Sequence, residues 1–282
     1  MFPTNASDAF EIVTVQSGDR SLRSREFGET FHPVVGPMAE AVGLHVRQQR
    51  LVERAAGSGG RFVVWDVGLG AAANALAVIE AFAGRTDRGA IELHSFDLDD
   101  RALGFALAHA EELGYLAPHR FAVRSLIAEG AWIEAPLQWR FHAGNFRETM
   151  ALAPAPHAIL YDPYSPQSNL EMWTLDHFTQ LHARLSPEAP CLLTNYTRST
   201  AVRVTLLLAG FYVGRGHATG EKDETTIATN APAILEEPLD QDWLARLRRS
   251  TNGAPLRAGI PRPSAIAVED WARLAGHPQF AA

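Results

Sequence analysis

Gly68 and Gly70 lie in a short stretch whose backbone could bind a ligand. They follow the apolar run 62–67 and precede the helical pattern that starts near Asn74. Because glycine has no Cβ, such a turn can approach a bound molecule closely. Its N–H groups would face a carboxylate or a ribose near the positive end of the helix. The alternative interpretation is a tight turn that serves packing alone.

The loop also indicates which cofactor it would suit. A dinucleotide fingerprint needs a third glycine for the approach of a pyrophosphate, and position 73 is alanine. This disfavours a nicotinamide or flavin dinucleotide, whereas S-adenosylmethionine carries no phosphate and tolerates the looser pattern. Asp97 then follows the next apolar run, 91–96, where open α/β sheets usually bind a ribose.

Asn145 follows the third apolar run and could contact the adenine amino group. An asparagine between a strand and a helix is equally well explained as a helix N-cap. Asp99 or Asp100 could cap the helix that follows them in the same way. Metal ligation is not expected, because no histidine pair has metal-ligand spacing and Cys191 stands alone. The predicted cofactor site therefore consists of Asp66, Gly68, Gly70, Asn74, Asp97 and Asn145.

Asp162 and Tyr164 follow the fourth apolar run, within the sequence Asp-Pro-Tyr-Ser-Pro. The carboxyl ends of parallel strands are where open α/β sheets place their ligands. Asp162 could accept a proton or a hydrogen bond from an amine, and Tyr164 could form a wall of the pocket. The flanking prolines restrict the backbone, as suits a preorganised site. The alternative is a proline-rich connection with a capping aspartate.

Alternating apolar and amphipathic segments predict an α/β fold with a mostly parallel, seven-stranded, Rossmann-like sheet. The last two strands have no helix between them, so an antiparallel hairpin is expected at one edge, which is typical of methyltransferases rather than dehydrogenases. Strands are predicted at 62–67, 91–96, 139–142, 158–161, 191–195, 211–214 and 225–229. Helices are predicted at 72–83, 100–113, 120–129, 145–150, 171–185 and 200–209.

Three segments are expected along the chain. Residues 1–60 form an N-terminal extension with strands near 11–15 and 21–24 and a helix at 37–53. Residues 61–230 form the cofactor-binding domain. Prolines interrupt the pattern in 231–282, which is expected to be a tail with helices at 240–249 and 268–274.

Composition narrows the class of protein. The chain has 282 residues, 46% hydrophobic and 20% charged, which is ordinary for a globular protein. No apolar run is long enough for a membrane span, and the N-terminus does not resemble a signal peptide, so a cytoplasmic location is expected. The net charge of −7 argues against non-specific nucleic-acid binding by the whole surface. Hydrolase G-x-S-x-G and phosphate-loop motifs are absent from the sequence.

Several motifs together resemble one known family. Asp162-Pro-Tyr-Ser-Pro, Asn169 and Met172-Trp173 are similar to the D-G-F-x-P-x-x-N-P-x-M-W motif of the tRNA 5-(aminomethyl)-2-thiouridine methyltransferases. The resemblance covers about residues 20–230 and extends to other segments in order, namely Ser24-x-x-Phe27-Gly28-Glu29-x-Phe31 with Gly36 and Glu40, Gly68-x-Gly70 with Asn74, Thr194-x-x-Thr197, Val202-Arg203, Ala209-Gly210-Phe211 and Lys222-x-Glu224.

This chain departs from the family pattern at several positions. Pro163 replaces the glycine after the strand-four aspartate, and Tyr164 replaces a phenylalanine. Alanines replace the third loop glycine and its neighbouring threonine, and Asn145 stands where an acid is expected. Many members are fused to a flavin-dependent oxidase that these 282 residues lack, so a separate flavin oxidase is expected as a pathway partner. The predictions of the fold and the cofactor do not depend on these positions, whereas the prediction of the exact substrate does.

The resemblance implies methyl transfer from S-adenosylmethionine to the exocyclic amine of a modified wobble uridine. Asp162 and Tyr164 would be catalytic, Glu40 and Trp173 would bind substrate, and the anticodon arm of tRNA would be the partner. Trp173 equally fits a buried helix face. Arginines and a lysine near the strand ends and on the tail could contact phosphates or be solvated charges. Two other hypotheses stay open: a methyltransferase of small molecules, and a non-catalytic binding protein that retains the fold.

Overall fold

Strand β3 (Phe62–Val67) lies in the middle of the sheet and is buried along its whole length. Its side chains alternate between two hydrophobic clusters, with Val64 in one and Trp65 in the other. A strand covered on both faces is apolar at nearly every position, and Asp66 is the exception in β3. The computed structural model describes residues 9–85, 89–220, 222–259 and 262–281.

The main sheet has the strand order β5-β6-β4-β3-β7-β8-β10-β9. The strands β6, β4, β3, β7 and β8 pair in parallel, whereas β10 pairs antiparallel with both β8 and β9, and β5 pairs antiparallel with β6. Their bounds are β4 (Ile91–Asp97), β5 (Ala131–Glu134), β6 (Leu137–Ala143), β7 (Ala158–Tyr161), β8 (Leu192–Asn195), β9 (Tyr212–Gly216) and β10 (Thr225–Thr229).

The predicted mostly parallel sheet and its terminal hairpin are confirmed, but the strand count of seven is wrong. Within the described residues the sheet has eight strands, because the short edge strand β5 adds to β6. Half of β5 is exposed, and it spans four residues. It is too short and too exposed for an alternating apolar pattern to reveal it.

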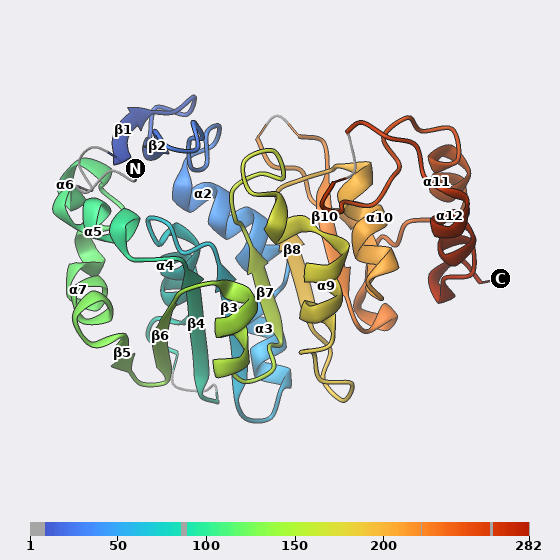
Figure 1. The fold of residues 1–282 in the computed structure, drawn as a ribbon. Helices are drawn as coiled ribbons and strands as arrows, with labels where there is room; N and C mark the ends of the chain where they lie inside the picture. The colour runs from blue at the N-terminus through green and yellow to red at the C-terminus, as the bar shows by residue number, and fades with distance from the viewer. Residues whose placement is uncertain (1–8, 86–88, 221, 260–261, 282) are drawn as a thin grey trace.

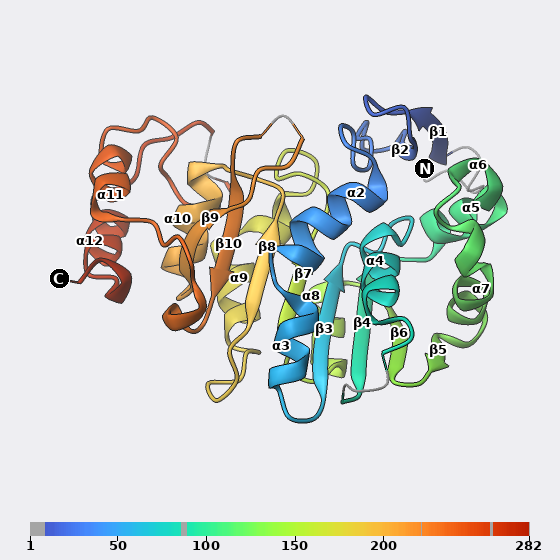
Figure 2. The ribbon, with the colours of Figure 1, turned by 180° about the vertical axis from the view of Figure 1, so that it is seen from behind.

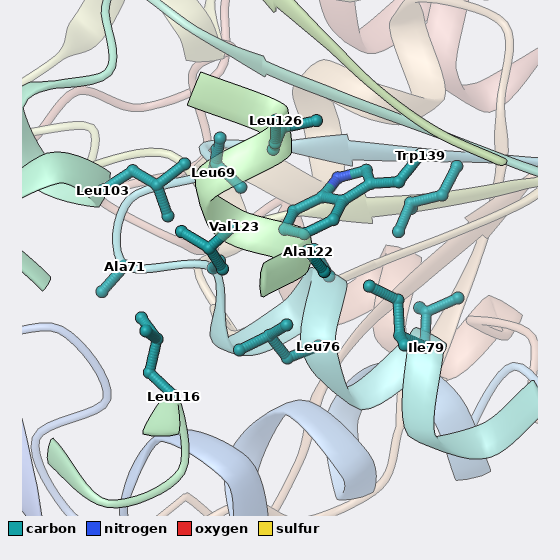
Figure 3. Close-up of a cluster of buried hydrophobic side chains, with 14 of the residues drawn as sticks. Leu69, Ala71, Leu76, Ile79, Leu103, Leu116, Ala122, Val123, Leu126 and Trp139 are labelled. Carbon is teal, nitrogen blue, oxygen red and sulfur yellow. The ribbon is translucent and has the colours of Figure 1, made fainter. Parts of the chain in front are cut away.

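Helices cover both faces of the sheet (Figures 1 and 2). On one face, α4 (Ala73–Phe82), α5 (Arg101–Ala108) and α7 (Arg120–Glu129) enclose the cluster drawn in Figure 3, which includes Leu76, Leu103, Val123 and Trp139. On the other face, α9 (Leu175–His182) and α10 (Thr200–Leu208) contribute to the buried cluster that contains Trp65. The smaller helices are α3 (Leu51–Gly57), α6 (Ala110–Leu113), α8 (Phe146–Thr149), η2 (Ala117–His119), η3 (Met150–Leu152), η4 (Leu170–Trp173), η5 (Pro232–Ile234) and η6 (Pro278–Phe280).

The N-terminal segment lies over the carboxyl end of the parallel strands (Figure 1). Its hairpin, β1 (Phe10–Thr14) and β2 (Arg20–Ser24), agrees with the predicted pair of strands. The predicted single helix at 37–53 is divided into α2 (Pro37–Ala41), a π-helix η1 (Val42–Arg47) and α3. The left-handed φ of 49° at Arg50 separates η1 from α3. These helices cross the sheet and contact α4 and β8.

The C-terminal residues pack at the far edge of the sheet (Figure 1). Here α11 (Gln241–Leu247) and α12 (Val268–Ala275) bury Trp243, Leu244 and Leu274 against the cluster that contains α10. The division of the chain at residues 60 and 230 stays a prediction. Among the described residues, no helix combines the length and apolar character needed to cross a membrane.

Candidate active site

The glycine turn after β3 forms one wall of a cavity at the carboxyl end of the sheet. Gly68 has a φ of 93°, and an added Cβ would lie 2.6 Å from the carbonyl oxygen of Asp162. Gly70 has a φ of 49°, and its Cβ would lie 2.9 Å from the ring of Phe31. Both positions therefore require glycine, since left-handed backbone and close contacts exclude a side chain.

The backbone amides of this turn are bonded within the protein. The N–H groups of Gly68 and Leu69 donate to the carbonyl of Phe96, and that of Gly70 donates to the Asp97 carboxylate at 2.9 Å. We predicted that such groups would face a ligand. In the structure the turn instead shapes the cavity and fixes Asp97, because the end of β4 lies close enough to accept these hydrogen bonds.

Asp97 lines the cavity at the end of β4. Its carboxylate also accepts a hydrogen bond from the N–H of Leu98 at 2.8 Å. Burial raises the pKa of Asp97 to about 6, although its two backbone hydrogen bonds act in the opposite direction. Each carboxylate oxygen retains a second lone pair. Asp97 can therefore accept hydrogen bonds from the hydroxyls of a ribose.

Asp66 has a different environment from the other predicted cofactor residues. It is fully buried, accepts a hydrogen bond from Ser95 Oγ at 2.7 Å, and is not among the described residues that line the cavity. Burial raises its pKa to about 8. Ser95 in turn accepts a hydrogen bond from the indole N–H of Trp139 at 2.8 Å. We therefore assign Asp66 to this internal network, which ties β3 to β4 and β6.

Asn145 is both a helix N-cap and part of the cavity lining, the two positions that its sequence interpretations require. Its side chain caps α8 by accepting a hydrogen bond from the N–H of Arg147 at 3.0 Å, and the residue also lines the cavity. Phe146 lines the cavity beside it, and Leu98, 65% exposed, lies on the same side. An adenine ring would find apolar surface and an amide here.

The carboxylate of Asp162 has two side-chain partners. Asn74 Nδ2 donates to Asp162 Oδ2 at 2.9 Å, and His32 Nε2 lies 3.3 Å from the same oxygen. Burial acts to raise the pKa of Asp162, but His32, His45 and Asn74 together outweigh it and leave the pKa below the usual range. Asp162 is therefore ionised at neutral pH and poorly suited to take up a proton.

His32 is a residue that the sequence analysis did not single out. Burial acts to lower its pKa, yet the nearby carboxylate of Asp162 raises the pKa above 6.5. Its side chain is 12% exposed and it lines the cavity. His32 immediately follows a segment that resembles the family motif, but the motif itself does not include it. Nothing local in the sequence places it beside a residue 130 positions away.

Glu40 and Lys222 complete the charged end of the cavity. Burial raises the pKa of Glu40 above its usual range, with His32 and Lys222 opposing the shift. Burial lowers the pKa of Lys222, whose ammonium group donates to the carbonyl of Tyr196 at 2.9 Å and lies 4.8 Å from the centre of that ring. Glu40 lines the cavity, and its contact with substrate stays a prediction.

Tyr164 forms an aromatic wall, whereas Trp173 lies beneath it. The Tyr164 ring stacks on Phe27, with 4.1 Å between the ring centres, and meets Phe31 edge-on. Trp173 is fully buried, lies outside the described cavity lining, and donates its indole N–H to the carbonyl of Tyr164 at 2.8 Å. We predicted that Trp173 binds substrate; its burial corrects that interpretation, because the ring is packed in the core and supports the loop of Tyr164.

These residues enclose a cavity of about 530 Å³, within the range of small-molecule and cofactor sites. Seven of the described residues that line it are acidic and three are lysine or arginine. The resulting negative potential favours a cationic ligand. S-adenosylmethionine, with its sulfonium, ribose and adenine, fits this set of groups: Asp97 suits the ribose, and Asn145 and Phe146 suit the adenine. No described residue beyond 222 lines the cavity.

Comparisons with known proteins agree with this geometry. Residues 137–231 match a family described as S-adenosyl-L-methionine-dependent methyltransferase. The chain is 30% identical over 272 residues to the tRNA 5-methylaminomethyl-2-thiouridine biosynthesis bifunctional protein MnmC of Ectopseudomonas mendocina, covering 88% of this chain and 40% of that protein. It is 32% identical over 224 residues to MnmC of Ralstonia nicotianae, covering 73% and 32%.

Among solved structures, MnmC2 from Aquifex aeolicus superposes with a TM-score of 0.69 at 21% identity, covering 94% of this chain and 85% of that one. This likeness establishes the fold. The chain spans about 40% of the length of the E. mendocina relative and a smaller share of the R. nicotianae one. The chain is therefore similar over most of its length to part of the MnmC bifunctional proteins, and its fold is the α/β, Rossmann-like class I methyltransferase fold.

Proposed function

We propose that this protein transfers a methyl group from S-adenosylmethionine to the exocyclic amine of 5-aminomethyl-2-thiouridine at the wobble position of tRNA. The observation that carries the proposal is the composition of one cavity. Groups suited to a nucleoside, Asp97 and Asn145, line it together with the charged group of Asp162, His32 and Glu40. The names of the MnmC relatives, which refer to tRNA 5-methylaminomethyl-2-thiouridine biosynthesis, point to the substrate class.

The residues at each end have distinct tasks. When bound, S-adenosylmethionine supplies an electrophilic methyl group on a sulfonium. Asp97 would hold the ribose hydroxyls, and Asn145 with Phe146 would hold the adenine. Asp162 and Glu40 would attract the acceptor amine by charge. Enclosure by this wall excludes water and aligns the reacting atoms, which supplies much of the rate in a displacement of this kind.

The aromatic wall suits a base that has left its stack. Tyr164, Phe27 and Tyr196 also line the cavity. Aromatic side chains stack on unpaired bases of RNA loops, and enzymes that modify a base take it out of the stack. Arg101 and Arg147 also line the cavity, where they could approach phosphates of an anticodon arm. A flavin oxidase, as in the bifunctional relatives, would supply the aminomethyl group.

Mass spectrometry of tRNA nucleosides tests this function. A strain lacking the protein should lose 5-methylaminomethyl-2-thiouridine and accumulate the aminomethyl precursor, and the wild-type chain should restore the methylated nucleoside. An unchanged nucleoside profile, with no tRNA methylation by the purified protein, would contradict the tRNA assignment.

The acidic lining favours a second candidate, a small cationic amine as methyl acceptor. Seven acidic lining residues and a net charge of −7 suit a cation better than a polyanion. The purified protein distinguishes the candidates: a preference for free polyamine-like amines over aminomethyl-bearing tRNA, measured by the initial rate of methyl transfer, would favour this alternative.

We expect cofactor affinity to depend on pH through Asp97. The folded-state pKa of about 6 means that Asp97 is protonated at pH 5 and ionised at pH 7. Because the ionised form is the better acceptor for ribose hydroxyls, binding should strengthen as the pH rises through 6. S-adenosylhomocysteine, which has no sulfonium, should bind up to about tenfold more weakly at pH 5 than at pH 7 by calorimetry.

The Asp97→Asn variant is the control for this pH dependence. Its affinity should be low and nearly equal at the two pH values, because the side chain no longer titrates. Equal affinity of the unaltered protein at pH 5 and pH 7 would remove Asp97 from the cofactor site.

A further inference from the structure

His32 has an unusual backbone conformation beside the cavity. Its φ is 48°, in the left-handed region that a residue with a Cβ rarely adopts. Such conformations cost about 1–3 kcal/mol and persist where the surroundings impose them, often at functional sites. The conformation places the imidazole in the cavity lining, with Nε2 3.3 Å from Asp162 Oδ2.

Methylation of an amine in this cavity requires a proton acceptor near the amine nitrogen. An alkylamine is protonated near neutral pH, and its nitrogen can attack the methyl carbon only after it has lost that proton. A general base must lie within hydrogen-bond reach of the proton, directly or through one water, and works best with a pKa near the working pH. The low pKa of Asp162 makes this carboxylate a weak base, whereas an imidazole is suited to the task.

We propose that His32 is the proton acceptor for the substrate amine and that Asp162 positions and charge-stabilises its imidazole. This inference rests on the proposed function. The ammonium nitrogen gives one proton to Nδ1 of the neutral imidazole, whose Nε2 faces Asp162, and regains its lone pair. That pair then forms the nitrogen–methyl bond while the electrons of the sulfur–methyl bond remain on sulfur. The imidazolium is held by the Asp162 carboxylate until it returns the proton to solvent.

The groups around His32 are consistent with this division of tasks. Asp162 at the end of β7 has the strongest favourable effect on the imidazolium, followed by Glu40 on α2 and Asn74 on α4. His45 on η1 is also buried nearby, with Nδ1 2.8 Å from Thr194 Oγ1. Burial lowers the pKa of His45 to about 4, so it is neutral and does not compete for the charge of Asp162. Lys222 faces Glu40 and Asp162.

The first test is nuclear magnetic resonance on the protein without cofactor. The imidazole Cε1–H signal of His32, assigned by its loss in His32→Asn, should titrate above pH 6.5. Asp162→Asn should lower this pKa more than Glu40→Gln does, because Asp162 is the stronger partner. A pKa unchanged by Asp162→Asn would overturn the pairing.

The second test is kinetic and uses tRNA that carries the aminomethyl group. Asparagine tolerates the left-handed backbone of position 32, so His32→Asn should fold and bind S-adenosylhomocysteine as the unaltered protein does. Its kcat should fall by about 10²–10⁴-fold with little change in KM, and the rise of kcat with pH near the His32 pKa should disappear. His32→Gln, a second neutral variant, should behave in the same way.

Retention of kcat and of its pH-dependent rise in both variants would overturn the assignment of His32. That result differs from a failure of the proposed function, in which the unaltered protein would methylate no aminomethyl-bearing tRNA. In that case the titration of His32 would still report its pairing with Asp162.

Discussion

Asp162→Asn is expected to lower the rate of methyl transfer by about 10²–10⁴-fold. Asparagine has nearly the same shape, so Asn74 and the loop can retain their positions, but the negative charge is lost. The variant would neither attract a cationic amine nor stabilise a protonated His32, whose Nε2 lies 3.3 Å from Asp162 Oδ2. Cofactor affinity should stay within a few-fold, because Asp97 and Asn145 are untouched.

Single-turnover kinetics and calorimetry with S-adenosylhomocysteine measure the two effects separately. Asp242→Asn, an exposed carboxylate on α11, is the control that removes one charge far from the cavity. Its transfer rate should equal that of the unaltered protein. Full activity of Asp162→Asn would remove Asp162 from the reaction altogether.

The stability of Asp162→Asn should also depend on pH. The lowered pKa of Asp162 contributes stability above 3.8 that is lost as pH falls through the folded value. The raised pKa of His32 contributes stability below 6.5 that is lost as pH rises through the folded value. The variant should therefore be most destabilised between about pH 4 and the His32 pKa, as measured by denaturant unfolding.

Gly68→Ala is expected to have the second large effect, on stability and on cofactor binding together. The φ of 93° disfavours any L-residue, and the new Cβ would lie 2.6 Å from the Asp162 carbonyl oxygen. Left-handed strain of about 1–2 kcal/mol adds to about 1–3 kcal/mol for forcing the β7 loop away. Since that loop carries Asp162, both thermal stability and methyl transfer should fall.

Gly18→Ala provides a matched control on the same chain. Gly18 has the same φ of 93°, but its added Cβ would meet nothing within 4 Å. Gly18→Ala should lose only the stability that the left-handed backbone costs an alanine. Its cofactor affinity, measured by calorimetry, should be unchanged. If the two variants unfold at the same temperature, the contact between the glycine turn and the Asp162 loop does not constrain the site.

The central strands and the order of the site residues were accessible from the sequence, because they depend on local patterns. β3 is apolar at every position except Asp66, and a glycine turn and a helix follow it directly. Asp97 and Asp162 each end or follow a parallel strand. Carboxyl ends of parallel strands share one edge of a sheet, so their meeting could be predicted.

Other features depend on contacts between distant segments and left no local signal. The sequence pattern places Trp173 on an apolar helix face. That pattern does not distinguish a ring packed in the core from a ring that stacks on the substrate. The sequence predicts that the backbone N–H groups of the glycine turn bind a ligand, yet Phe96 and Asp97 accept their hydrogen bonds. Strand β5 was missed because an edge strand of four residues is stabilised by pairing with β6 rather than by its own pattern.

The sequence by itself determined the sheet, the glycine turn and the carboxylates at the strand ends, because periodicity and turn chemistry act over a few neighbouring residues. Only the tertiary structure decided the protonation of the site. It brought His32 and Glu40 from the N-terminal segment to Asp162, and burial together with their mutual charges then set the pKa of each group.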